Sequence, residues 1–283
     1  MRILVLGASG MLGNAMLRYL HANGEDVRGT VRSQRAAQFL PDETRPLLID
    51  GVDVAQQDSL VAGLAKAKPD VVINCIGIVK QLASAEDPLV AVPVNTLLPH
   101  RLAQLCALAG ARLIHISTDC VFSGNKGMYT EDDIPDAQDL YGRSKLLGEV
   151  DCPHAITLRT SIIGRELNGS RSLVDWFLSQ TDAVMGYRRA IYSGLPTVEL
   201  ARVICEFVLP RPELHGLYHV SSDPISKLDL LGILAKTYER SIQITPDDEL
   251  VIDRSLDSTR FQLATGYVPP AWSELVEQMR RFG

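Results

Sequence analysis

Apolar residues in the first half of the chain form short runs that alternate with amphipathic stretches. Most of the runs are continuously apolar, which predicts parallel strands covered on both faces. The stretches between them repeat their apolar positions every three to four residues, as helices do. The predicted strands cover residues 2–6, 26–31, 47–50, 71–76, 112–117 and 155–159. The predicted helices cover residues 11–22, 57–67, 95–109 and 139–150.

Alternating strands and helices predict an α/β fold, a doubly wound parallel sheet of Rossmann type with right-handed crossovers. After the sixth strand, glycine and proline divide the chain into shorter elements. A late strand near 217–220 and helices at 227–238 and 272–282 are expected there. We therefore expect a sheet domain over residues 1–160, to which the late strand returns, and a smaller C-terminal lobe over residues 161–283.

The composition is that of an ordinary globular protein, with 46% hydrophobic and 22% charged residues among 283. A net charge of −6 argues against nucleic acid or an anionic membrane as the main partner. No apolar run approaches a membrane span, and the apolar start is too short for a signal peptide, so a cytoplasmic location is expected. The 5 cysteines form no C-x-x-C pair and the histidines lack ligand spacing, so we expect free thiols and no metal site.

A glycine-rich turn with the spacing G-x-x-G-x-x-G follows the first predicted strand and opens the first helix. Glycine allows the tight turn and lets the backbone approach a pyrophosphate, whose charge is met by N–H groups at the helix start. The turn predicts that the sheet domain binds NAD(P), although a strand–turn–helix without a ligand is the alternative. The residues expected to bind the cofactor here are Gly7, Ser9, Gly10, Met11, Leu12 and Gly13.

The end of the second predicted strand bears on the choice of cofactor. An acidic residue there would bind the ribose 2′-hydroxyl of NAD and repel the extra phosphate of NADP. This chain has Arg32 at that end, and Asp26 lies at the other end of the strand. A guanidinium pairs well with a phosphate, so we expect NADP(H) to be preferred, with NAD(H) as the alternative. A solvated surface arginine is the other interpretation of Arg32.

Two more segments follow predicted strands, at the edge where open α/β sheets bind their ligands. Asp53 and Val54 come after the third strand, where a carboxylate can meet the adenine amino group. Cys75, Ile76 and Gly77 come at the end of the fourth strand, where the backbone would line the cofactor. Each is expected to bind the cofactor, and an ordinary turn is the alternative for each.

Tyr141 and Lys145 form a Y-x-x-x-K pair on one face of a predicted helix. A lysine ammonium beside a phenol favours the phenolate and lowers the tyrosine pKa. Such a tyrosine can protonate a ketone oxygen while hydride arrives from a nicotinamide. Thr118, at the end of the fifth strand, can hydrogen-bond the same oxygen. The alternative for Thr118 is a purely structural role in a strand-end turn or a helix cap.

These motifs resemble the extended short-chain dehydrogenase/reductases, and within them the dTDP-4-dehydrorhamnose reductase group. The likeness covers nearly the whole chain in order. The matching stretches are Gly7–Gly13, Asn95 within VNTLLPHRLA, ISTDCVFSG (116–124), YGRSKLLGE (141–149), TLRTSIIG (157–164), SGLPTVELA (193–201) and DRSLDSTRFQLATGYVPPAW (253–272).

The resemblance implies a role for each of five residues. Thr118, Tyr141 and Lys145 would be catalytic, with Tyr141 and Lys145 also binding the cofactor. Thr118 and Asp119 would contact the sugar, and Asn95 would support the lysine. The C-terminal lobe would bind most of the substrate. Guanidinium groups suit a diphosphate, although a surface arginine is the alternative for each, and the candidates in the lobe are Arg165, Arg171, Arg188, Arg189 and Arg254.

The implied activity is NADPH-dependent reduction of a 4-keto-6-deoxy sugar nucleotide, as in polysaccharide biosynthesis. Related dehydratases carry an acidic pair after the threonine, whereas Asp119 is followed here by Cys120, which favours simple reduction. The group often has an aromatic residue where this chain has Ile162, so the exact sugar nucleotide is left open. The alternatives are an epimerase that retains NAD and a non-catalytic regulatory subunit that binds the cofactor. The family also suggests a homodimer through helices that flank the sheet.

Overall fold

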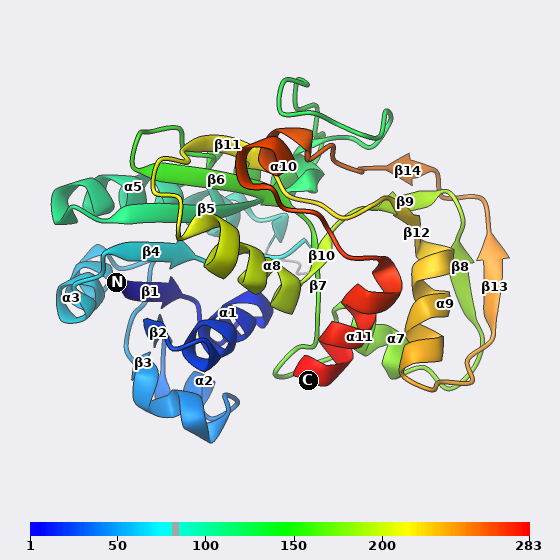
Figure 1. Ribbon diagram of the computed structural model, residues 1–283, viewed down its shortest axis with the longest axis horizontal. Helices are drawn as coiled ribbons and strands as arrows, with labels where there is room; N and C mark the ends of the chain where they lie inside the picture. Colours follow the sequence, from blue (N-terminus) through cyan, green and yellow to red (C-terminus); the bar gives the residue numbers. More distant parts are fainter. Residues whose placement is uncertain (81–84) are drawn as a thin grey trace.

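The computed structural model describes residues 1–80 and 85–283. A large sheet lies on one side of the molecule, and a group of short strands and helices lies on the other (Figure 1). The sheet has seven parallel strands in the order β11-β6-β5-β4-β1-β2-β3. This Rossmann order confirms the predicted fold class. Its strands are β1 (Arg2–Leu6), β2 (Asp26–Thr30), β3 (Leu48–Ile49), β4 (Val71–Asn74), β5 (Arg112–Thr118), β6 (Ala155–Thr160) and β11 (Gly216–His219).

Helices cover both faces of this sheet. Because successive side chains of a strand point to opposite faces, Ile3 and Val5 of β1 enter one core while Leu4 and Leu6 enter the other. The first core includes α1 and α8, and the second includes α3 and α5. The helices are α1 (Met11–Ala22), α2 (Gln34–Ala37), α3 (Gln57–Ala67), α4 (Pro88–Ala91), α5 (Leu98–Ala109), α6 (Leu140–Leu147), α7 (Leu173–Leu178), α8 (Thr197–Val203), α9 (Lys227–Thr237), α10 (Thr259–Thr265) and α11 (Trp272–Phe282).

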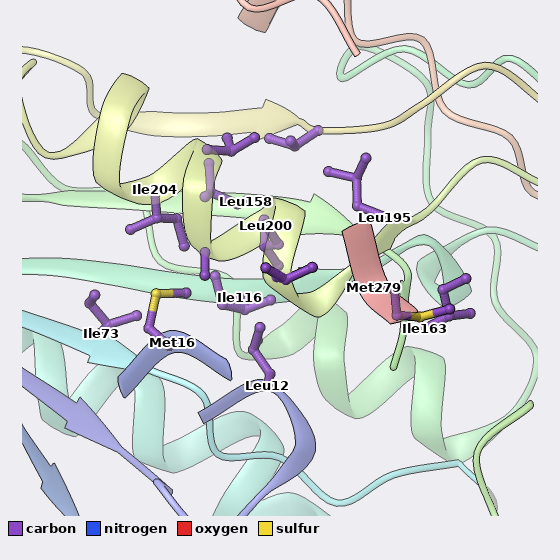
Figure 2. Packing of buried hydrophobic residues seen from close by; sticks show 14 of the residues in the cluster. Leu12, Met16, Ile73, Ile116, Leu158, Ile163, Leu195, Leu200, Ile204 and Met279 are labelled. Carbon is purple, nitrogen blue, oxygen red and sulfur yellow. The ribbon is translucent and has the colours of Figure 1, made fainter. Parts of the chain in front are cut away.

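The larger core joins the sheet to the C-terminal part of the chain. Figure 2 shows Leu12 and Met16 of α1 facing Leu200 of α8, with Ile116 of β5 beside them. Met279 of α11 belongs to the same cluster. Helices that follow residue 160 therefore pack directly on the sheet. The assignment of cofactor binding to residues 1–160 and substrate binding to residues 161–283 stays a prediction.

The C-terminal lobe contains short strands that the sequence pattern did not predict. Their partners lie far away in the sequence: β9 pairs antiparallel with β12 and parallel with β14. Strands of two to four residues are stabilised by this pairing, and they are too short to show a pattern of their own. These strands are β7 (Ile162–Ile163), β8 (Val184–Tyr187), β9 (Ala190–Tyr192), β10 (Leu195–Pro196), β12 (Ile225–Ser226), β13 (Ile244–Asp247) and β14 (Ile252–Asp253).

Some bounds differ from the predicted ones where they affect the site. Strand β4 ends at Asn74, so the next residues lie in the loop after it. Helix α5 begins at Leu98, because the preceding turn Val92–Leu97 is π-helical and includes Asn95. Such wide turns occur often at functional sites. Within the described residues, no helix is long and apolar enough to cross a membrane.

Candidate active site

The glycine turn between β1 and α1 has the close packing that its sequence predicts. Gly7 has φ +81°, in the left-handed region that glycine adopts readily. A Cβ atom on Gly13 would lie only 2.1 Å from the Gly7 carbonyl oxygen. Gly10 is the N-cap residue of α1 and supplies no side-chain cap. The turn therefore brings bare backbone and a helix N-terminus together, which is the arrangement that binds a pyrophosphate.

The other predicted residues of this turn differ in exposure. Ser9 and Met11 are partly exposed, whereas the side chain of Leu12 is buried in the larger core. Leu12 can therefore reach a cofactor only through its backbone. The Gly7 N–H donates to Thr30 Oγ1 at 3.2 Å, which holds the turn against the end of β2.

Arg32 lies two residues beyond the end of β2 and is exposed. Within the described chain, no carboxylate forms an ion pair with it. Ser33 beside it caps α2 by accepting a hydrogen bond from the Ala36 N–H at 3.4 Å. The guanidinium thus stands at the carboxyl edge of the sheet without a protein partner, as a group that binds phosphate would.

Asp53 and Val54 lie in the turn after β3. One oxygen of the Asp53 carboxylate accepts the Ala55 N–H at 3.0 Å, and the Asp53 N–H donates to Ser59 Oγ at 2.8 Å. Val54 is buried in the second core. These turn contacts use one oxygen of the Asp53 carboxylate, and the second oxygen is left for another donor.

The loop after β4 connects the glycine turn to Lys145. The Ile76 N–H donates to Asn74 Oδ1 at 3.1 Å, which shapes the loop. A Cβ atom on Gly7 would lie 2.8 Å from Ile76 Cγ1, and one on Gly77 would lie 3.9 Å from Lys145 Nζ. Burial raises the pKa of the Cys75 thiol to about 12, so this cysteine is neutral and unreactive at neutral pH.

Lys145 is buried, and its ammonium group points to β5. Its Nζ donates to the Ile116 carbonyl oxygen at 2.8 Å. Burial lowers the pKa of Lys145 to about 8, although the nearby Glu149 carboxylate acts in the opposite direction. The lysine is therefore still mostly charged at neutral pH.

Asn95 supports this lysine through its neighbours. Its Nδ2 donates to Ser144 Oγ at 3.1 Å, and its Oδ1 accepts the Ile78 N–H at 2.9 Å. Asn95 thereby links the loop after β4 to the residue that precedes Lys145 in α6. The π-helical turn places the asparagine between these two segments.

Thr118 and Tyr141 meet at the end of β5. Thr118 Oγ1 donates to Asp119 Oδ1 at 3.2 Å and accepts the Cys120 N–H at 3.2 Å. Burial raises the pKa of the Tyr141 phenol, and its interaction with the Thr118 hydroxyl opposes this only in part. Asp139 caps the helix that carries Tyr141, accepting the Gly142 N–H at 2.7 Å.

The expectation that Lys145 lowers the pKa of Tyr141 is therefore wrong for this arrangement. Loss of solvent dominates at the phenol, and the Cys120 thiol and the Asp119 carboxylate raise its pKa further. The lysine ammonium is bound to a strand carbonyl instead. Tyr141 is thus fully protonated at neutral pH, which is the state that a proton donor requires.

Sequence reasoning missed Lys227, the first residue of α9, which the fold brings to this end of the sheet. Its Nζ lies 4.1 Å from the centre of the Tyr192 ring, and the Asp119 carboxylate attracts it. No motif around Lys227 signals this position, because its neighbours come from distant segments.

The candidate arginines of the lobe are already partly engaged. Arg165 is paired with Asp175, and Arg188 is paired with Asp248 at 2.8 Å. Arg254 donates from Nε to a backbone carbonyl oxygen at 2.8 Å. Across residues 1–80 and 85–283, no group of three or more His, Cys, Asp or Glu residues could hold a metal ion.

Known proteins with related sequences match most of the chain. The family model described as RmlD substrate binding domain matches residues 1–281. The probable low-salt glycan biosynthesis reductase Agl14 of Haloferax volcanii is 34% identical over 236 residues, which are 77% of this chain and 73% of that protein. Methionine adenosyltransferase 2 subunit beta of Xenopus tropicalis is 34% identical over 258 residues, which are 84% of this chain and 72% of that protein.

A solved structure has the same fold throughout. It is the dTDP-4-dehydrorhamnose reductase of Bacillus anthracis in complex with NADP, with a TM-score of 0.82 and 20% identity over 100% of this chain and 98% of that chain. The family match confirms the resemblance drawn from the motifs. The chain is an enzyme of the oxidoreductase type and resembles sugar-nucleotide reductases. It belongs to the RmlD substrate binding domain family, among the extended short-chain dehydrogenase/reductases.

Proposed function

We propose that the chain reduces a 4-keto-6-deoxy sugar nucleotide with NADPH. The observation that carries this proposal is the meeting of Thr118, Tyr141 and Lys145 at the carboxyl edge of the sheet. Gly77 lies beside Lys145 there, and the glycine turn lies beside the same loop. A proton donor and a cation thus stand next to a cradle that fits a dinucleotide.

The residues present fit NADPH. A Cβ atom at Gly13 would collide with the turn, so the close approach of backbone that a pyrophosphate needs is built in. Arg32 would pair with the 2′-phosphate, Asp53 would meet the adenine, and Tyr141 and Lys145 would hold the nicotinamide ribose. When bound, NADPH supplies the hydride that the carbonyl carbon accepts. The B. anthracis reductase of the same fold is in complex with NADP, which supports this choice.

The side chains around the carbonyl then complete the reduction. The Tyr141 hydroxyl donates its proton to the carbonyl oxygen as that oxygen gains negative charge. Lys145, whose ammonium is held by the Ile116 carbonyl oxygen, would bind the nicotinamide ribose beside Tyr141. The Thr118 hydroxyl orients the carbonyl through a hydrogen bond, and Asp119 contacts the sugar.

Simple reduction fits this site better than dehydration. Related dehydratases carry a pair of acids after the threonine, one of which protonates the leaving hydroxyl, and Cys120 stands in place of the second member of that pair. Burial raises the pKa of the Cys120 thiol to about 12, which leaves it far too weak an acid for this step.

The first test follows absorbance of NADPH at 340 nm with dTDP-4-dehydrorhamnose as substrate. Replacing Tyr141 by phenylalanine removes the proton donor, so kcat is expected to fall by about 10²–10⁴-fold while NADPH affinity stays within about threefold. Tyr187→Phe, at an exposed tyrosine of β8, is the matched control and is expected to keep full activity. Oxidation of NADPH that Tyr141→Phe leaves unchanged would refute the proposed mechanism.

A second candidate function is that of a regulatory subunit. The relative from X. tropicalis is named as a subunit of methionine adenosyltransferase, at the same 34% identity as the reductase from H. volcanii. This candidate predicts NADPH binding without consumption of NADPH by any keto sugar nucleotide. The cytoplasmic location and the homodimer stay predictions.

A further inference from the structure

Helix α9 begins with a lysine in an unfavourable position. Lys227 is its first residue, directly after the capping Ser226, whose Oγ accepts the Asp229 N–H at 3.0 Å. The N-terminal end of a helix carries partial positive charge and disfavours a cation. Burial adds a second cost and lowers the pKa of Lys227 to about 8.

The protein offsets these costs only weakly. Among the described residues, none forms an ion pair or a hydrogen bond with Lys227 Nζ. The ammonium stands over the Tyr192 ring, 4.1 Å from its centre, which is a cation–π contact. Asp119 and Cys120 attract it from the end of β5. A half-buried cation without a direct partner is typical of a binding residue rather than a structural one.

At the end of β5, Asp119 is a buried negative charge that faces the positive charge of Lys227. Its carboxylate is buried beside Thr118, whose hydroxyl is its hydrogen-bond donor at 3.2 Å. Two cations attract it, Arg254 and Lys227. Arg254 is already engaged, because its Nε donates to the Phe122 carbonyl oxygen at 2.8 Å. Of these two cations, Lys227 is therefore the one whose N–H donors are not used by the described residues.

We propose that Lys227 and Asp119 together hold a hydroxyl group of the sugar ring, with Lys227 Nζ donating to its oxygen and Asp119 accepting its proton. This assignment rests on the proposed function. The two charges cancel, so the pair suits a neutral hydroxyl. A diphosphate would be repelled by Asp119, and its place is therefore elsewhere in the lobe.

The test compares binding of dTDP-rhamnose with binding of dTDP, both measured by calorimetry in the presence of NADP. Lys227→Met is expected to weaken dTDP-rhamnose at least tenfold and to leave dTDP within twofold, because only the sugar touches Lys227. Lys227→Arg keeps the charge and is expected to restore most of the affinity. Lys236→Met, at an exposed lysine of the same helix, is the matched control and is expected to change neither affinity.

Two further measurements separate a binding role from a structural one. Lys227→Met is expected to raise KM for dTDP-4-dehydrorhamnose with kcat within threefold, as the loss of uniform binding does. Its urea midpoint is expected to stay equal to or exceed that of the wild type, because a half-buried cation at a helix N-terminus is removed. A lower midpoint, or an equal loss of dTDP and dTDP-rhamnose affinity, would overturn the assignment.

The experiment also separates this inference from the proposed function. Wild-type protein that reduces the substrate while Lys227→Met binds dTDP-rhamnose normally refutes the role of Lys227 alone. Wild-type protein that binds dTDP-rhamnose through Lys227 without oxidising NADPH refutes the reductase alone. Wild-type protein that binds no dTDP-rhamnose refutes both.

Discussion

We predict that the choice between two cofactors depends on a single side chain, Arg32. It is exposed at the end of β2, and the chain has no acidic side chain between Thr30 and Ser33. Hydrogen bonds to a charged group contribute about 1.5–3 kcal/mol, and tenfold in affinity corresponds to about 1.4 kcal/mol. We therefore expect this one guanidinium to set the size of the NADPH preference.

Replacing Arg32 by alanine is expected to weaken NADPH at least tenfold and to leave NADH within twofold, because only NADPH carries the 2′-phosphate. Fluorescence titration of the purified protein with each nucleotide measures this. Arg35→Ala, at the exposed arginine of α2, serves as control and is expected to change the two affinities little. If Arg32→Ala lost affinity equally for NADPH and NADH, the arginine would not bind the 2′-phosphate.

Tyr141 and Lys145 show which properties of a site a motif can predict. The i, i+4 spacing predicted that both side chains would lie on one face of a helix near Thr118. The protonation of Tyr141 was not predictable, because it depends on burial by segments that are distant in the sequence. Lys227 was missed for the same reason, since its surroundings exist only in the folded chain.

At the scale of elements, the turn between β1 and α1 leaves no room for a side chain. Gly13→Ala would place a methyl group 2.1 Å from the Gly7 carbonyl oxygen, so the backbone has to shift. We expect a loss of about 1–3 kcal/mol in the free energy of unfolding and the loss of NADPH binding. Urea unfolding and nucleotide titration of the same preparation measure both.

Gly232 in α9 is the matched control for this substitution. A Cβ atom there would meet nothing within 4 Å, and the residue lies in a helix. Gly232→Ala is expected to stabilise the protein by up to about 1 kcal/mol, because alanine favours helices. If Gly13→Ala behaved like Gly232→Ala, the close packing of the turn would have no role in stability or binding.

The elements of the sheet were predictable to within a few residues, whereas those of the lobe were not. Strand β1 is apolar from Ile3 to Leu6 because both of its faces are buried there, and the pattern shows this directly. In the lobe, β9 alternates between buried and half-buried residues over only three positions. Its existence depends on pairing with β12 and β14, which local sequence does not encode.

At the scale of the whole molecule, stability should depend on pH in two opposing ways. Burial raises the pKa of Cys75, Cys106 and Cys120 from 9.0 to about 12, so the unfolded chain loses these protons first as pH rises. Each thiol then lowers the free energy of unfolding by about 1.4 kcal/mol per pH unit above pH 9. Burial lowers the pKa of Lys145 and Lys227 from 10.5 to about 8, so the folded chain loses these protons first. The two lysines therefore raise the free energy of unfolding as pH increases from about 8 to 10.5.

The free energy of unfolding is therefore expected to rise from pH 8 to 9, where the lysines act alone. It is expected to fall steeply above about pH 10.5, where the thiols act together with tyrosines such as Tyr141 and Tyr267, whose pKa values burial also raises. Urea unfolding in the presence of a reductant, at intervals of one pH unit from 7 to 12, measures this profile. Cys106→Ala should make the alkaline fall shallower by one proton. A steady fall from pH 8 onward would contradict the lowered pKa values of the lysines.

The position of β11 at the edge of the sheet also determines the order in which the chain can fold during synthesis. This strand lies at residues Gly216–His219 but pairs with β6, which ends at Thr160. A nascent chain that has not yet reached β11 presents β6 as an open edge, which invites pairing with other chains. Because ribosomes add about 5–20 residues per second, this edge stays uncovered for several seconds while the first part of the lobe is made. The sheet therefore cannot finish folding before much of the lobe has been translated.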